Sequence, residues 1–293
     1  AMGTSPVDAN LPGMPGSTHD RKPDPGAAFS LLHQHIKGVA IKQRIELGEL
    51  FLGCETANKY DCFMWDPSVG VDDWKKGFKP DSQLYSLRER GDGCKAFCNR
   101  QCCGSMRGFV MDMVPNGAYV PNAASHDEMI VMERPFKCEC ACFCRPRINV
   151  MHPALGDLCE VYFPCPVDCC INWTFYVRQP TKEGATKLAK DLPDDWYIIK
   201  GYKCQPGALC TCPTGPCKNV QLRIYDAADT ECTTQIGTIA KVFSGCLKEA
   251  FTDADSFVVE FPEGANPMQK AALVACTVLL DFLLFENNER HGE

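Results

Sequence analysis

Residues 271–285 read AALVACTVLLDFLLF, an apolar run whose only charged residue is Asp281. As a helix, this run would be about 22 Å long at 1.5 Å per residue. A bilayer core is about 30 Å thick, and an aspartate near its centre would cost about 3 kcal/mol more. The run therefore predicts a helix buried in the centre of a soluble domain. A membrane span and an interfacial segment are the alternatives.

Upstream of this run, the sequence predicts short strands separated by turn residues. In residues 219–226, Val220, Leu222 and Ile224 alternate with more polar residues, and this period of two is typical of a half-buried strand. Roughly twelve such segments favour a mainly β fold, either a sandwich or a barrel. The predicted strands cover residues 50–54, 60–65, 83–87, 108–114, 129–134, 147–151, 158–163, 171–178, 196–201, 219–226, 235–242 and 256–261.

The composition is that of a folded, acidic protein. The 293 residues include 30 Lys and Arg against 37 Asp and Glu, for a net charge of −7, and 45% are hydrophobic. Disorder through most of the chain is excluded, and we expect no nucleic-acid partner because such proteins are usually basic. Gly-x-Ser-x-Gly, His-Glu-x-x-His and phosphate-binding glycine loops are all missing, so we expect no covalent catalysis.

The chain is expected to consist of a flexible tail, one folded domain and a short polar end. Residues 1–28 are rich in Pro and Gly and begin with Ala1-Met2-Gly3, which is typical of a tag scar. This segment has no apolar signal core, which predicts a cytoplasmic location. The expected domain covers residues 29–286, with inserted polar loops at 66–81, 116–127 and 180–195, and the polar end covers residues 287–293.

Cysteine is unusually frequent, with 21 residues in several groups. The cytoplasm keeps thiols reduced, and an odd count disfavours complete pairing, so we expect no disulfides. Neighbouring groups could supply the four thiolates of a zinc site, although the spacing of a zinc ribbon is not present. Acylation and simple packing remain open as alternatives. The possible zinc ligands are Cys94, Cys98, Cys102, Cys103, Cys204, Cys210, Cys212 and Cys217.

Five collinear segments make the chain resemble the phospholipid scramblase family. Residues 248–286 read KEAFTDADSFVVEFPEGANPMQKAALVACTVLLDFLLFE. Upstream, in the order of the family, stand FLGCETANKYDCF at 51–63, CNRQCCGSMRGF at 98–109, MERPFKCECACFC at 132–144 and IGTIAKVFSG at 236–245. A collinear set of this kind is much more specific than any single motif, although membership of a family does not settle activity.

The resemblance implies a fold that agrees with the strand count. Scramblases are similar to Tubby-like proteins, which form a closed twelve-stranded antiparallel barrel around a central hydrophobic C-terminal helix. Residues 268–285 would form this helix, with Asp281 near the mouth of the barrel, whereas another description of the family makes the same segment a membrane anchor. Its central positions would be Ala271, Leu273, Val274, Leu279, Leu280, Asp281, Phe282 and Phe285.

The resemblance also implies movement of phospholipids between bilayer leaflets, without ATP and in response to calcium. The corresponding calcium segment begins with Asp253 and Asp255, and Glu260 and Glu263 could assist them. Calcium needs six to eight oxygen ligands, and the EF-hand pattern is not met, because Gly264 stands where that loop requires a carboxylate. The alternative interpretation is a pair of turn carboxylates that begins a strand.

Family members often carry an acylated cysteine run, which corresponds here to Cys138, Cys140, Cys142 and Cys144. Several acyl chains would attach the protein to the cytoplasmic leaflet of the plasma membrane or of another membrane. The alternative function is a soluble cytoplasmic barrel without scrambling activity, which zinc could stabilise. Such a scaffold would bind protein partners through the Pro-rich tail and the loops.

Overall fold

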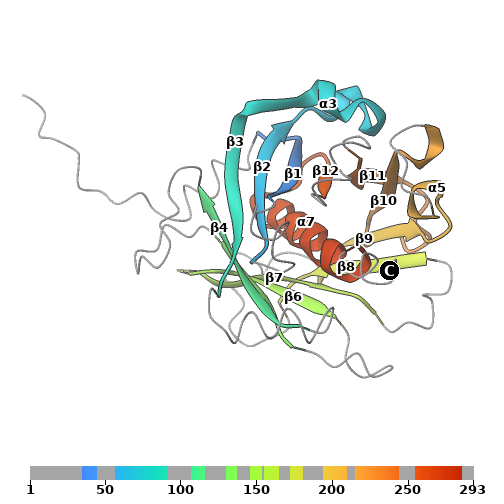
Figure 1. Ribbon diagram of the computed structural model, residues 1–293. Coiled ribbons are helices and arrows are strands. Elements are labelled where there is room, and N and C mark those ends of the chain that lie inside the picture. Colours follow the sequence, from blue (N-terminus) through green and yellow to red (C-terminus); the bar gives the residue numbers. More distant parts are fainter. Residues whose placement is uncertain are drawn as a thin grey trace, which may run out of the picture.

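The computed structural model describes residues 35–44, 57–91, 107–115, 130–136, 146–153, 155–164, 172–180, 194–209, 215–243 and 255–285. These residues form a ring of antiparallel strands around one helix (Figure 1). The strands are β1 Gly38–Arg44, β2 Lys59–Trp65, β3 Phe78–Glu89, β4 Phe109–Pro115, β5 Ile130–Arg134, β6 Arg147–His152, β7 Gly156–Tyr162, β8 Asn172–Arg178, β9 Asp195–Tyr202, β10 Asn219–Asp226, β11 Gln235–Val242 and β12 Ser256–Glu260.

Each strand pairs with its neighbours in the sequence, and β12 pairs with β1 to close the barrel. In the closing register, Val39 lies opposite Val259 and Ile41 lies opposite Phe257. Closure leaves the sheet without an unpaired edge. The predicted closed, twelve-stranded antiparallel barrel is therefore confirmed.

The centre of the barrel is filled by α7, Pro267–Leu280, and by the π-helical turn η7, Asp281–Phe285, that continues it. Asn266 begins α7 with a capping box, in which its side chain accepts from the backbone N–H of Gln269 and the Gln269 side chain accepts from that of Asn266. Eleven of the twelve positions from Met268 to Leu279 are buried, and the long apolar side chains pack against the inner faces of the strands. The predicted central helix is thus confirmed.

Within the described part of the chain, Pro267–Phe285 is the one helix long and apolar enough to cross a bilayer. Its 19 residues correspond to about 28 Å, longer than the run considered from the sequence because the helix begins at Pro267. Most of this helix is buried inside the barrel. The interior of the barrel is therefore a packed core and not an open channel.

The structure differs from the prediction at two strands. The strand β1 was not predicted, whereas the predicted strand 50–54 lies outside the described residues. The other eleven predicted strands correspond to β2 to β12.

The predicted loop 66–81 is shorter than expected, because β3 already begins at Phe78. Three short helices occupy the connection: η1 Pro67–Val69, η2 Val71–Asp73 and α3 Trp74–Gly77. Trp74 is buried with Trp65 against the outer sides of Ala40, Ala240 and Val258. This connection therefore covers the outer face of β1, β11 and β12.

The remaining connections include α5, Pro206–Leu209, and η6, Gly215–Cys217, between β9 and β10. The predicted loop 116–127, most of the loop 180–195, the tail 1–28 and the end 287–293 lie outside the described residues.

Candidate functional site

The last turns of α7 end at one mouth of the barrel, where several polar side chains point inward. Because α7 runs back along the barrel after the turn that follows β12, Asp281 returns to the level of Asp255, just before β12. The hydroxyl of Tyr60, on β2, donates to a carboxylate oxygen of Asp281 at 2.6 Å. The ammonium of Lys241, on β11, lies 2.6 Å from a carboxylate oxygen of Asp255. We call Tyr60, Lys241, Asp255 and Asp281 the mouth cluster.

The mouth cluster contains a carboxyl group that favours its protonated form. Burial, and next the negative charge of Asp255, raise the pKa of Asp281 well above its ordinary value, against the opposing effects of Lys241 and of the Tyr60 hydrogen bond. Asp281 also shares a hydrogen bond with Asp255. One lysine charge thus faces two carboxyl groups, and a shared proton relieves the excess negative charge.

A second polar contact lies beside the mouth cluster. Arg107 forms a buried ion pair with Glu89, and its guanidinium lies 4.5 Å from the centre of the Phe282 ring. The other carboxylate oxygen of Glu89 accepts from the backbone N–H of Asn58 at 2.9 Å. Phe282 also stacks on Phe109 at 4.2 Å. The end of the central helix is therefore fixed both by packing and by buried polar contacts.

The structure separates the predicted calcium ligands that it describes, Asp255, Glu260 and Glu263. Asp255 is paired with Lys241, so a cation there would compete with an ammonium already in contact. Glu260 lies at the opposite end of β12, about 16 Å along the strand, where it accepts from Thr238. Glu263 lies in the exposed turn beyond it, and Asp253 is outside the described residues. Among the residues that the structure describes, no three potential ligands gather around one point, so these residues alone do not form a calcium site.

The predicted cysteine sites fall mostly outside the described residues. This holds for the acylation candidates Cys138, Cys140, Cys142 and Cys144, and for Cys94, Cys98, Cys102, Cys103, Cys210 and Cys212 of the zinc candidates. Cys204 is exposed and Cys217 is half-buried. Acylation and zinc binding therefore stay predictions.

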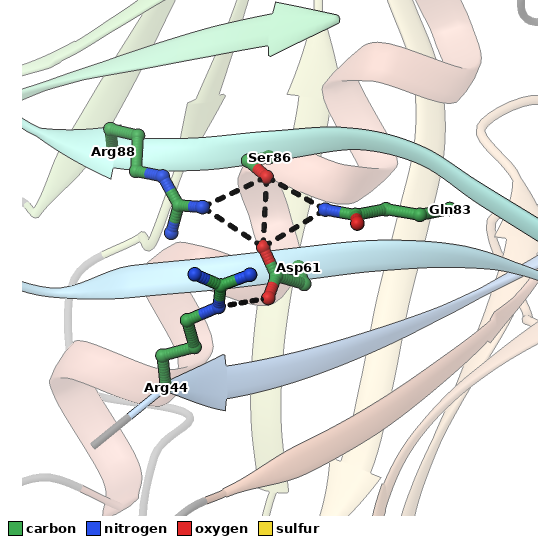
Figure 2. Close-up of polar contacts among 5 residues, drawn as sticks. All are labelled: Arg44, Asp61, Gln83, Ser86 and Arg88. Carbon is green, nitrogen blue, oxygen red and sulfur yellow. Dashed lines mark hydrogen bonds and ion pairs between the residues drawn. The ribbon is translucent and has the colours of Figure 1, made fainter. Parts of the chain in front are cut away.

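The outer face of the barrel carries a polar cluster near the same mouth, centred on Asp61 (Figure 2). One oxygen of Asp61 accepts from Gln83 at 3.1 Å, Ser86 at 2.8 Å and Arg88 at 3.0 Å, and the other accepts from Arg44. These side chains come from the adjacent strands β1, β2 and β3. Asp61 is only 6% exposed, so its charge is balanced by direct contacts and not by water.

A similar cluster surrounds Glu160 on the other side of the barrel. Its carboxylate lies 3.1 Å from Arg178 and 3.5 Å from Arg147. The guanidinium of Arg178 also lies over the ring of Tyr162, at 4.2 Å. Charged side chains therefore populate the outer surface, unlike the apolar band of a barrel that spans a membrane.

The family resemblance predicted the position of Asp281 near the mouth, but the partners of Asp281 were not predicted. Tyr60 and Lys241 stand in strands that were predicted, and a lysine at an inward position of an apolar strand is a signal that could have been noticed. Asp61, an aspartate within the strand KYDCFMW, is a similar signal. The partners of each residue follow only from the strand register, which the sequence alone does not give.

Together, these features define a closed antiparallel barrel with a helical core, whose helix ends in a buried polar cluster. The chain belongs to the scramblase family, whose model matches residues 16–287.

Curated relatives extend this result over nearly the whole chain. Phospholipid scramblase 1 of Homo sapiens is 28% identical over 284 residues, which are 95% of this chain and 71% of the relative. Phospholipid scramblase 2 of Bos taurus is 26% identical over 281 residues, 94% of this chain and 76% of the relative. Phospholipid scramblase family member 5 of Homo sapiens is 26% identical over 256 residues, 85% and 74% of the two chains. No solved structure gives a significant match.

Proposed function

We propose that this protein moves phospholipids between the leaflets of a bilayer, without ATP, in response to calcium and from the cytoplasmic membrane surface. The observation that carries the proposal is the family match over residues 16–287, together with relatives named phospholipid scramblases. Acylation of Cys138, Cys140, Cys142 and Cys144 would provide the attachment, since a single acyl chain binds only marginally.

The packed interior limits how such movement could occur. A phospholipid headgroup must cross about 30 Å of hydrocarbon, in which polar groups find no partners. The barrel offers no inner path while α7 fills it. We therefore propose that the lipid path runs outside the barrel, with the protein lying on the membrane surface.

The test is leaflet exchange of a fluorescent phospholipid in liposomes that contain the purified, reduced protein, measured with and without calcium. A parallel measurement uses chemically acylated protein, whose attachment to the membrane does not depend on cellular enzymes. We expect exchange without ATP that increases with calcium and decreases in the double variant Asp253→Ala/Asp255→Ala. The variant Asp81→Ala, which removes an exposed carboxylate outside both the mouth cluster and the predicted calcium segment, is the matched control.

Each outcome decides one part of the proposal. Absence of exchange by acylated, folded protein would overturn the activity itself. Exchange that does not respond to calcium would keep the activity and remove the calcium response. Because Asp255 also pairs with Lys241, the double variant must show the unfolding transition of the parent protein before its loss of exchange is counted.

The second candidate function is a scaffold that binds protein partners without moving lipid. It is favoured by the filled interior and by exposed aromatic side chains such as Phe136 and Tyr202, which are 61% and 59% exposed. Stable partners should then be recovered by cross-linking in cells even when exchange in liposomes fails. Metal analysis of the purified protein would test whether zinc stabilises it, with the cysteine groups as the predicted ligands.

A further inference from the structure

A polar pocket lies on the outer face of the barrel, whereas the mouth cluster lies inside it. Its cavity has a volume of about 330 Å³ and is bounded by β8, β9, β10, α5 and the turn between β10 and β11. This volume is at the lower end of the range for small-ligand sites, about 300–1,000 Å³. Side chains that line it include Asn172, Lys200, Gln205, Arg223, Glu231 and Cys232.

Two positive charges meet in this pocket on neighbouring strands. Lys200, on β9, and Arg223, on β10, are directly opposite each other in the strand register. Their neighbours Ile199, Leu222 and Ile224 belong to the inner core, so both charged side chains point outward. Like charges directly opposite each other in a sheet destabilise it. The sequence therefore keeps an unfavourable pair at the position where the pocket is formed.

Lys200 and Arg223 do not have, among the described residues, the carboxylate partners that balance the positive charges in the other outer clusters. Arg88 is paired with Asp61, and Arg178 is paired with Glu160. Neither Lys200 nor Arg223 forms an ion pair with any carboxylate of the described ranges. The Lys200 ammonium is hydrogen-bonded to the side chain of Cys232, which raises the pKa of that lysine and keeps it charged. Glu231 lines the same pocket without reaching either cation, which leaves the pocket with one excess positive charge.

The pocket also contains an unused hydrogen-bond acceptor. The side-chain oxygen of Asn172 is buried and has no donor within the described part of the chain. A buried acceptor without a partner costs free energy, which a hydroxyl group of a ligand would recover. The opposite wall is already fixed: Gln205 accepts from the backbone N–H of Gln221 at 2.8 Å and donates to the carbonyl of Tyr202 at 2.9 Å. A wall held in this way loses little conformational entropy when a ligand binds.

We propose that this pocket binds a phosphate-bearing polyol. Lys200 and Arg223 hold the phosphate, because a guanidinium and an ammonium are the side chains that match its charge and its oxygens. Asn172 and Glu231 accept from the hydroxyl groups. The same chemistry occurs in a soluble polyol phosphate and in the headgroup of a glycerol-bearing anionic lipid. This binding site goes beyond the proposed function, since its occupation does not depend on movement of lipid between leaflets.

The test measures binding to the intact protein with two probes. Calorimetry with sn-glycerol 3-phosphate, compared with inorganic phosphate, covers the soluble source. Sedimentation with phosphatidylcholine vesicles, with and without phosphatidylglycerol, covers the lipid source. We expect Lys200→Gln/Arg223→Gln to weaken binding by at least about tenfold. The control Lys37→Gln/Lys79→Gln also removes two positive charges, but outside the pocket, and should bind like the parent protein.

A second variant keeps the test valid if the double variant does not fold. Asn172→Asp conserves the shape of the side chain and places a negative charge next to the phosphate, so it should also weaken binding. Loss in the pocket variants but not in the control supports the proposal, and the probe that binds identifies the source. Lack of binding to both probes, or equal loss in pocket and control variants, overturns it. Equal affinity for inorganic phosphate and sn-glycerol 3-phosphate would overturn the role of the hydroxyl groups.

Discussion

Protonation of one residue, Asp281, makes the stability of the barrel depend on pH. Its pKa is raised chiefly by burial and by the charge of Asp255, so the folded protein holds a proton that the unfolded chain releases. The bound proton therefore stabilises the folded protein fully below the ordinary carboxyl pKa, about 4. This stabilisation is lost as the pH rises through the raised pKa of the folded protein.

Replacing Asp281 with Asn should remove this loss of folding stability at rising pH. The amide of the Asp281→Asn variant can still accept from Tyr60 and donate to Asp255, as the protonated acid does. We expect the free energy of unfolding of the variant to decline less than that of the parent as the pH rises above about 4, by up to about 1.4 kcal/mol per pH unit. Urea unfolding over a pH series measures this, with Glu263→Gln as the control. Parallel curves for parent and variant would contradict the assignment.

Asp61 is a buried carboxylate whose removal would leave the charge of Arg88 without its ion-pair partner. Truncation by Asp61→Ala would leave the guanidinium of Arg88, with a side chain 9% exposed, beside Ser86 without its carboxylate (Figure 2). Breaking such a buried pair should lower the free energy of unfolding by about 3–5 kcal/mol. The matched control is Asp73→Ala, whose pair with Lys76 is exposed at the surface, and which should cost less than about 1 kcal/mol. Similar losses for both variants, measured by chemical denaturation, would refute this account.

At the scale of the element, sequence patterns predicted most strands because their inward positions are apolar and alternate regularly. The strand β10 illustrates this, with Val220, Leu222 and Ile224 in the core. The strand β1, GVAIKQR, escaped prediction because Ala40 faces an outer apolar cluster instead of water, so alternation is lost at its centre. The start of β3 was not predicted, for a different reason. Lys79, Pro80 and Asp81 are exposed and polar, although they continue a strand.

The elements of the site were less predictable than those of the fold. That α7 is buried follows from its length and composition, and the position of Asp281 near the mouth follows from the family resemblance. The pairing of Asp255 with Lys241, and of Glu89 with Arg107, depends on which strands become neighbours and in which register. These contacts join residues from different strands and connections, and no local pattern encodes them. Of the calcium ligands expected from a contiguous segment, Asp255 and Glu260 are separated because β12 carries Glu260 to the opposite end of the barrel.

At the scale of the whole molecule, the barrel and its helix form one cooperative core, and three buried thiols can report on it. Cys62 lies on β2, Cys159 on β7 and Cys276 on α7, and each is at most 1% exposed within the same core. Burial raises the pKa of all three thiols, which suppresses the reactive thiolate. Cys204, in contrast, is exposed.

These thiols distinguish a helix that stays in the barrel from one that enters the membrane. We expect a maleimide to label Cys204 promptly and the three core thiols only at the rate of global unfolding, as followed by peptide-resolved mass spectrometry. The same pattern should hold when vesicles are present. If α7 instead left the barrel to span the bilayer, its own Cys276 would remain protected by lipid, while Cys62 and Cys159 would lose their cover and react. Selective labelling of those two thiols with vesicles would therefore refute a permanently filled barrel and with it a lipid path confined to the outer face.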